Sequence, residues 1–247
     1  MKPTRWLQTS LGTACAVSLL VLGAGTAAPP VHAGAPLVKT SAPGFYRMML
    51  GDFEVSALSD GTLDLPVDKL LTNTRPGKVT TALNQSFLKA PVETSVNAYL
   101  INTGDKLVLV DTGAAGLFGP TLGKLVGNLK AAGYQPEQVD AVVITHMHAD
   151  HVGGLMAGEQ RVFPNATVHA DQHDADHWLS QANMDKAPAD AKGFFQGAMA
   201  SINPYVAAGK FNPFTGDTEL GPGIKAVASR GHTPGHSTSF CPLLSTT

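Results

Sequence analysis

The stretch that decides the fold is residues 141–151, which read AVVITHMHADH. Its first four residues form a short, continuous and largely β-branched run, which is typical of a strand covered on both faces. In an extended exit from such a strand, side chains at i and i+2 project to the same side, so His146 and His148 can hold one cation. Asp150 and His151, just beyond, are free to turn towards a second cation. A chance cluster of surface histidines is the weaker explanation, because three histidines and an aspartate gather at the end of one strand.

The ligand atoms at such a site must be nitrogen and oxygen, because the chain is short of cysteine. Cys15 lies inside an N-terminal apolar segment, and Cys241 lies near the end of the chain. A lone cysteine in the processed chain can form neither an internal disulfide nor a thiolate cluster for a metal. Imidazole and carboxylate suit zinc or a similar first-row divalent ion. We therefore expect two divalent ions as cofactors, with zinc as the expected metal.

Strands and helices alternate on either side of this stretch. Alternating apolar and polar residues predict a strand over 53–58, followed by a turn at Asp60-Gly61. Apolar residues spaced i, i+3, i+4 and i+7 predict a helix over 122–129, with Gly133 as its C-terminal cap. The other expected strands are 97–101 and 106–110, paired as a hairpin, then 166–169 and 224–228, and the other expected helices are 171–182 and 191–202. This succession predicts an α/β layered fold.

Composition and charge narrow the class of protein. The chain has 247 residues, of which 43% are hydrophobic and 15% charged, with a formal net charge of −2. This length permits one domain with a core that needs no disulfide or metal to hold it together. Phosphate binding needs clustered lysine and arginine, and the sequence has no basic run. We therefore expect no nucleic acid partner.

The first 33 residues have the layout of a signal peptide. A basic start precedes an apolar run over 11–28, and residues 31–33 read VHA, a small-x-small pattern. A membrane anchor is the alternative, but it needs about 20 firmly apolar residues, and glycine, serine and Pro29-Pro30 interrupt this run. We expect cleavage after residue 33, a mature domain over 34–247 that is periplasmic or secreted, and no stable membrane insertion.

The metal motif has a family resemblance. His146-x-His148-x-Asp150-His151 resembles the HxHxDH signature of metallo-β-lactamase-fold hydrolases. Three further segments match that family, namely Asp111-Thr112-Gly113, Gly153-Gly154 and Gly231-His232-Thr233-Pro234-Gly235-His236. Residues 42–236 are also similar to the methyl parathion hydrolase branch, in segments that include Tyr46-Arg47-Met48, Leu58-Ser59-Asp60-Gly61 and residues 111–120. The resemblance implies an αββα sandwich with two metal ions in a cleft at the ends of the sheets.

The resemblance also assigns roles to individual residues. It makes His146, His148 and His232 the ligands of one metal ion, and it makes Asp150 and His151 ligands of the other. Asp150 is then the catalytic ligand that helps to hold the hydroxide.

Two kinds of neighbouring residue remain open to more than one interpretation. Asp111 is expected to accept a hydrogen bond from a ligand imidazole and fix its tautomer, and the alternative is a plain turn residue. His236 is expected to be a structural neighbour of the ligands. His173 and His177 are spaced to bind metal on a helix, but a solvated face shared with Asp174 and Asp176 is the better interpretation.

The reaction that the resemblance implies is hydrolysis of an organophosphate triester by a metal-bound hydroxide. The substrate would be a small neutral organophosphate or ester, so the cleft should have aromatic walls. Phe118, Trp178 and Phe194 lie in segments that resemble the pocket of this branch, and packing in the core is the alternative for each. A lactonase or esterase of the same fold is the main rival function, and a metal-binding protein without turnover is another. His148 argues against a diiron redox enzyme. A homodimer is one of the oligomeric states that the sequence permits.

The end of the chain departs from the family pattern. That pattern has a bridging aspartate beyond His232 and a final histidine later still, whereas residues 237–247 contain neither. Pro242 also argues against a strand there. We therefore expect the second half of the sandwich to be incomplete, with the C-terminal part missing through truncation or a frameshift, and a natural short variant is the alternative. A weak second metal site, low or absent activity and poor solubility would follow.

Overall fold

The fold lies in the second of two units into which contacts divide the chain, residues 1–40 and residues 41–247. It is seen in a computed structural model that describes residues 35–39, 42–221 and 223–241. The expected signal peptide lies outside the described residues. Within those residues, none of the helices combines the length and the apolar character needed to cross a membrane.

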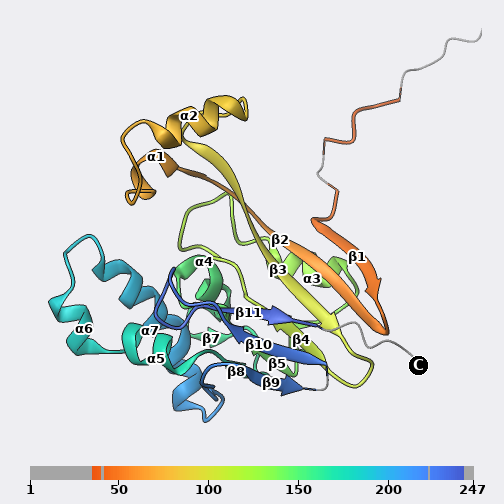
Figure 1. Ribbon diagram of the computed structural model, residues 1–247. Coiled ribbons are helices and arrows are strands. Elements are labelled where there is room, and N and C mark those ends of the chain that lie inside the picture. Colours follow the sequence, from red (N-terminus) through yellow and green to blue (C-terminus); the bar gives the residue numbers. More distant parts are fainter. Residues whose placement is uncertain (1–34, 40–41, 222, 242–247) are drawn as a thin grey trace, which may run out of the picture. The chain divides into compact units, whose positions relative to one another are not determined.

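A six-stranded sheet forms the centre of the fold (Figure 1). Its order is β1-β2-β3-β4-β5-β8, antiparallel from β1 to β4 and parallel from β4 to β8. The strands are β1 (Phe45–Leu50), β2 (Phe53–Leu65), β3 (Val92–Asn102), β4 (Leu107–Val110), β5 (Ala141–Val143) and β8 (Thr167–His169). Parallel neighbours need crossover connections, and helices supply them here. The carboxyl ends of β4 and β5 therefore lie side by side, and this is where the histidine motif begins.

A second sheet covers one face of the first. It has the order β11-β10-β9, with the strands β9 (Thr218–Gly221), β10 (Ile224–Ala228) and β11 (Ser237–Phe240), and a separate two-stranded hairpin is formed by β6 (Met156–Ala157) and β7 (Gln160–Arg161). Ile224 packs on Val108, Val110 and Val143 of the large sheet. The prediction that the tail cannot form a strand is wrong for residues 237–240, which pair antiparallel with β10. Pro242 follows this strand and lies outside the described residues.

Helices cover the opposite face of the large sheet. They are α3 (Leu125–Ala131), α4 (Ala149–Val152), α5 (Gln172–Trp178) and α7 (Lys192–Ala207), each of which contributes buried residues to the core. The other helices, α1 (Val67–Leu70), α2 (Lys78–Gln85) and α6 (Gln181–Lys186), contain no buried residue, and 3-10 turns lie at Pro136–Gln138 and Gly153–Leu155. Leu107 and Leu109 face the helices, whereas Val108 and Val110 face the small sheet, as the alternation of a strand requires. The predicted mixed α/β fold is confirmed.

Two local predictions are wrong. The turn expected at Asp60-Gly61 is a bulge inside β2, which continues to Leu65. The chain stays in the sheet because Asp60 is buried and accepts hydrogen bonds from the backbone N–H groups of Ala114 and Leu125. The helix expected over 171–182 is instead two helices, because Ser180 caps the N-terminus of α6.

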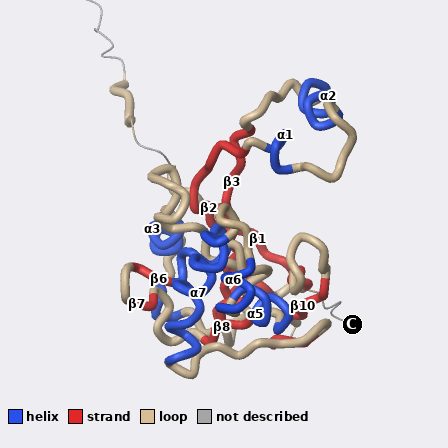
Figure 2. Tube along the Cα trace, turned by 90° about the vertical axis from the view of Figure 1, so that its left-hand side faces the viewer, coloured by secondary structure: helices blue, strands red, loops and turns tan. Residues whose placement is uncertain are grey.

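The tip of the β2–β3 pair carries α1 and α2, which were not predicted (Figure 2). The two strands stay paired as far as Leu65 and Val92. Neither α1 nor α2 contains a buried residue. This tip therefore rests on its strand pairing rather than on a core of its own.

Candidate metal centre

Two loops bring distant histidines together above the ends of the sheets. We call residues 145–148, between β5 and α4, the upstream histidine loop, and residues 231–236, between β10 and β11, the downstream histidine loop. The loops meet where β11 begins, since the Ser237 N–H donates to the carbonyl of Thr145 at 2.9 Å. The order of the strands thus places His232 beside His146 and His148.

These three histidines converge. One ring nitrogen from each of His146, His148 and His232 lies within 4.8 Å of the others. Only 3% of His146 is exposed, and its Nε2 atom is buried without a hydrogen-bond partner. A buried polar atom left unsatisfied costs free energy, so this nitrogen fits the role of a metal ligand. The donor set of three imidazoles suits zinc.

Ionisation favours the ligand form of these side chains. Burial, helped by the neighbouring histidines, lowers the pKa of His146 to about 2. Burial and the nearby His232 lower the pKa of His148 to about 4. Both rings are therefore neutral at pH 7, as metal binding requires.

A hydroxyl group orients His146. The Thr145 Oγ1 atom lies 2.8 Å from Oδ2 of Asp111 and 3.1 Å from Nδ1 of His146. The hydroxyl has one proton, which it donates to the carboxylate, so it accepts the N–H of His146 Nδ1. This leaves the buried Nε2 atom of His146 with its lone pair free.

Asp150 and His151 lie next to the triad and bond to each other. Nε2 of His151 is 3.3 Å from Oδ2 of Asp150, and its Nδ1 is 2.8 Å from Oδ2 of Asp111. Burial lowers the pKa of His151, but the hydrogen bonds to Asp111 and Asp150 raise it to about 10. Burial raises the pKa of Asp150, but the hydrogen bond to His151 and its charge bring it below the usual value. His151 therefore carries a proton at neutral pH, and a second metal ion bound by these two residues would have to displace it.

A cavity of about 520 Å³ adjoins this cluster through Ala149, the first residue of α4. Phe118 and Phe194 line it, together with Leu117 and with Asp190 as a charged group. The lining of the cavity is mostly apolar, and it includes two of the three aromatic residues named from the sequence.

Trp178 lies elsewhere, in the core. It is only 8% exposed, with its ring edge-on to His148 at 5.2 Å and 4.8 Å from the ring of Phe195. It supports the ring of a candidate ligand and is not among the residues that line the cavity.

The remaining histidines of the sequence analysis lie around the cluster. The ring of His236 lies 5.0 Å from that of His146, and its Nδ1 is 2.7 Å from Ser229 Oγ. His173 is exposed and bonds to Asp171 at 2.7 Å, and His177 stacks edge-on against Trp178.

Thr145 was not predicted as part of the site, and Asp174 lies in a different environment from the one predicted. Asp174 was expected on a solvated helix face but is fully buried. A signal was present, because Asp174 shares one face of α5 with the apolar Ala175 and Trp178. Thr145 carries no comparable signal, since its role depends on Asp111, which is distant in the sequence.

Comparison with known proteins gives one family match. The profile of the Metallo-beta-lactamase superfamily matches residues 91–243. An N-acyl homoserine lactonase of a Bacillus species is 27% identical over 159 residues, which are 56% of this chain and 54% of that protein. An N-acyl homoserine lactonase of Bacillus thuringiensis is 26% identical over 161 residues, or 58% of this chain and 56% of that protein. The chain thus spans about half the length of the curated relatives it matches.

Solved structures that share the fold include AbOPH and AidC. The crystal structure of AbOPH, described as a hydrolase in the beta lactamase superfamily, has a TM-score of 0.72 and 37% identity, covering 80% of this chain and 69% of that one. AidC, a dizinc quorum-quenching lactonase in complex with a product, has a TM-score of 0.73 and 22% identity, covering 82% of this chain and 71% of that one. At that identity, the likeness to AidC shows the fold alone.

Proposed function

Because the chain belongs to the metallo-beta-lactamase superfamily, we propose that it catalyses metal-dependent hydrolysis of small neutral esters, with lactones as the first substrate class. The observation that carries the proposal is the convergence of His146, His148 and His232 beside an apolar cavity. Zinc is the metal we propose, supported by the three-imidazole donor set and by the description of AidC as a dizinc enzyme. Asp150 and His151 are proposed to hold a second ion.

A bound divalent ion would supply an activated water molecule and polarise the carbonyl or phosphoryl oxygen of the substrate. The chain's own residues do the rest. Thr145 and Asp111 orient the His146 ring, and Trp178 supports the ring of His148. Asp150 and His151 can hold a proton between Oδ2 and Nε2 beside the triad.

The cavity favours an uncharged substrate with an apolar part. Leu117, Phe118 and Phe194 supply apolar surface next to the histidines, whereas Asp190 would repel an anion. Lactones are the first candidate class because the two Bacillus lactonases match more than half of this chain.

Organophosphate triesters are the second candidate. This class is the one that the sequence resemblance of residues 42–236 to the methyl parathion hydrolase branch implies. Phe118 and Phe194 could pack against an aryl leaving group. Such a leaving group departs without a proton donor, so the reaction needs no further acid.

The test compares both substrate classes on zinc-loaded protein. Hydrolysis of an N-acyl homoserine lactone is measured by the release of acid. Hydrolysis of an aryl phosphotriester is measured by the release of the phenolate. We expect lactone turnover that disappears in His148→Ala. Triester turnover without lactone turnover would replace the first candidate by the second. Zinc-loaded protein that hydrolyses neither ester would refute the proposed function.

A further inference from the structure

Asp174 lies between the two histidine loops but belongs to neither motif. It is the third residue of α5, the helix that comes after β8 in the chain. Asp171 caps the N-terminus of this helix, because its side chain accepts a hydrogen bond from the His173 N–H. This cap fixes the first turn of the helix, and the turn directs Asp174 inwards. Asp174 is 0% exposed.

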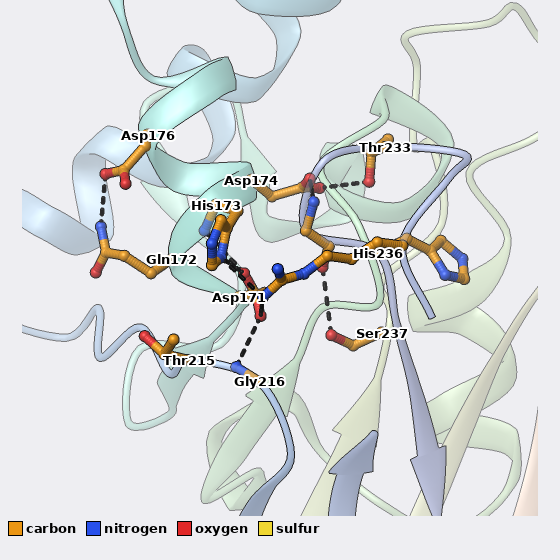
Figure 3. Close-up of polar contacts among 12 residues, drawn as sticks. Asp171, Gln172, His173, Asp174, Asp176, Thr215, Gly216, Thr233, His236 and Ser237 are labelled. Atoms are coloured by element: carbon orange, nitrogen blue, oxygen red, sulfur yellow. Dashed lines mark hydrogen bonds and ion pairs between the residues drawn. The ribbon is translucent and has the colours of Figure 1, made fainter. Parts of the chain in front are cut away.

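One carboxylate accepts hydrogen bonds from both loops. Oδ2 of Asp174 accepts from the Met147 N–H at 2.9 Å. The same oxygen accepts from Oγ1 of Thr233 at 3.0 Å (Figure 3). Oδ1 accepts from the Gly235 N–H at 2.6 Å. Met147 stands between His146 and His148, and Thr233 follows His232. In each loop, a residue next to a candidate ligand therefore donates a hydrogen bond to the same carboxylate, that of Asp174.

The downstream loop also packs directly on the start of α5. A Cβ atom at Gly235 would overlap the backbone nitrogen of Asp174 and would lie 3.0 Å from Oδ1 of Asp171. A glycine is therefore required at this point. The close approach makes the hydrogen bonds to Asp174 part of a tight contact rather than a surface pairing.

We propose that Asp174 is a positioning residue of the metal centre, which fixes the spacing between the upstream and downstream histidine loops. His232 is exposed and its loop would otherwise be held to the upstream loop mainly by the Ser237–Thr145 hydrogen bond. A ligand set binds metal tightly when its members are held in place before the ion arrives. The inference rests on the metal-binding part of the proposed function and on no particular substrate.

The test measures zinc affinity by competition with a chromophoric chelator, together with the visible spectrum of the Co²⁺ form. Asp174→Asn keeps the volume but puts an amide NH₂ where one of the three donors points. We expect a loss of zinc affinity of about 10- to 100-fold, typical of residues that orient metal ligands, and a changed Co²⁺ spectrum.

Asp60→Asn is the matched control, because Asp60 is also buried and accepts backbone N–H groups, but from Ala114 and Leu125. It should keep the parent's zinc affinity and spectrum. Thr233→Val removes one donor and should lower affinity less, whereas Thr233→Ser should retain it. This pair also tests the inference if Asp174→Asn does not fold.

Parent-like affinity and spectrum in both Asp174→Asn and Thr233→Val would overturn the inference, as would an equal loss in Asp60→Asn. The measurement needs no substrate. A parent protein that binds zinc but hydrolyses neither ester would therefore refute the proposed function while leaving the role of Asp174 intact.

Discussion

Thr145 stands between Asp111 and His146, and its hydroxyl can donate only one proton. The tautomer of a candidate metal ligand therefore depends on a side chain outside the proposed ligand set. The histidine triad was predictable because the ligands sit in two recognisable motifs. Thr145 and Asp174 were not, because their partners are brought close by the fold and leave no local pattern.

The residue-scale prediction concerns that hydroxyl. In Thr145→Val the N–H of His146 Nδ1 loses its acceptor, so the neutral ring no longer favours one tautomer. We expect a fall in zinc affinity of roughly 10-fold or more, measured by chelator competition. Thr145→Ser keeps the hydroxyl and should bind zinc like the parent. Equal affinities in the valine and serine variants would show that the hydroxyl has no orienting role.

At the scale of elements, helices and strands whose apolar residues recur at a regular spacing were predicted from the sequence. Elements without such a spacing were not predicted. The strand predicted over 224–228 coincides with β10, and the helix predicted over 191–202 overlaps α7, which begins one residue later and continues to Ala207. The exposed α1 and α2 gave no signal, because neither buries a residue against the core. Asp60-Gly61 was misjudged since its burial depends on a loop far along the chain.

Asp140 gives an element-scale prediction about pH. Its carboxylate accepts from the Leu107 N–H at 2.9 Å and the Lys106 ammonium at 3.1 Å, at the start of β4. Partial burial raises the pKa of Asp140, but these two hydrogen bonds bring it below the usual value. A lowered pKa in the folded state stabilises the fold above the unfolded pKa of about 3.9, and this stability is lost as pH falls through the folded pKa.

The comparison is the urea midpoint of the parent and of Asp140→Asn as a function of pH. The parent should be the more stable of the two at neutral pH, and its advantage should shrink below about pH 4. A difference that stays constant across that range would show that the charge of Asp140 does not contribute.

A pair of glycines gives a second prediction at this scale. A Cβ at Gly154 would overlap the backbone carbonyl oxygen of Thr112, whereas a Cβ at Gly127 in α3 would meet nothing within 4 Å. We expect Gly154→Ala to lower the free energy of unfolding by about 1–3 kcal/mol or more. Gly127→Ala should raise it by up to about 1 kcal/mol, because alanine favours the helix. Chemical denaturation of both variants measures these changes in the free energy of unfolding. Equal changes in the two variants would contradict the close packing at Gly154.

For the whole molecule, the sequence was sufficient to predict a mixed α/β fold, because its strong apolar runs correspond to the central strands. It was not sufficient for the small sheet. Pro242 argued against a strand, but β11 ends before that residue and pairs with β10 through 237–240. A local rule about proline could not anticipate where the strand would stop.

The whole-molecule prediction is that zinc stabilises the fold. A ligand at 100 times its Kd stabilises the state it binds by about 2.7 kcal/mol. For a domain of this size, that corresponds to a rise in Tm of roughly 5–10 °C. Scanning calorimetry with and without zinc, and with excess chelator, measures it. His148→Ala should abolish the rise, and an unchanged Tm of the parent would count against a metal centre.

His146 and His232 lie far apart along the chain, and the loop that carries His232 joins β10 to β11 of the small sheet. Long-range contacts form slowly because closing a large loop costs entropy before any contact repays it. Metal capture should therefore be a late event in the folding pathway. In refolding experiments, we expect the Co²⁺ absorption to develop after the circular dichroism of the large sheet, so that acquisition of the ion marks completion of the native state.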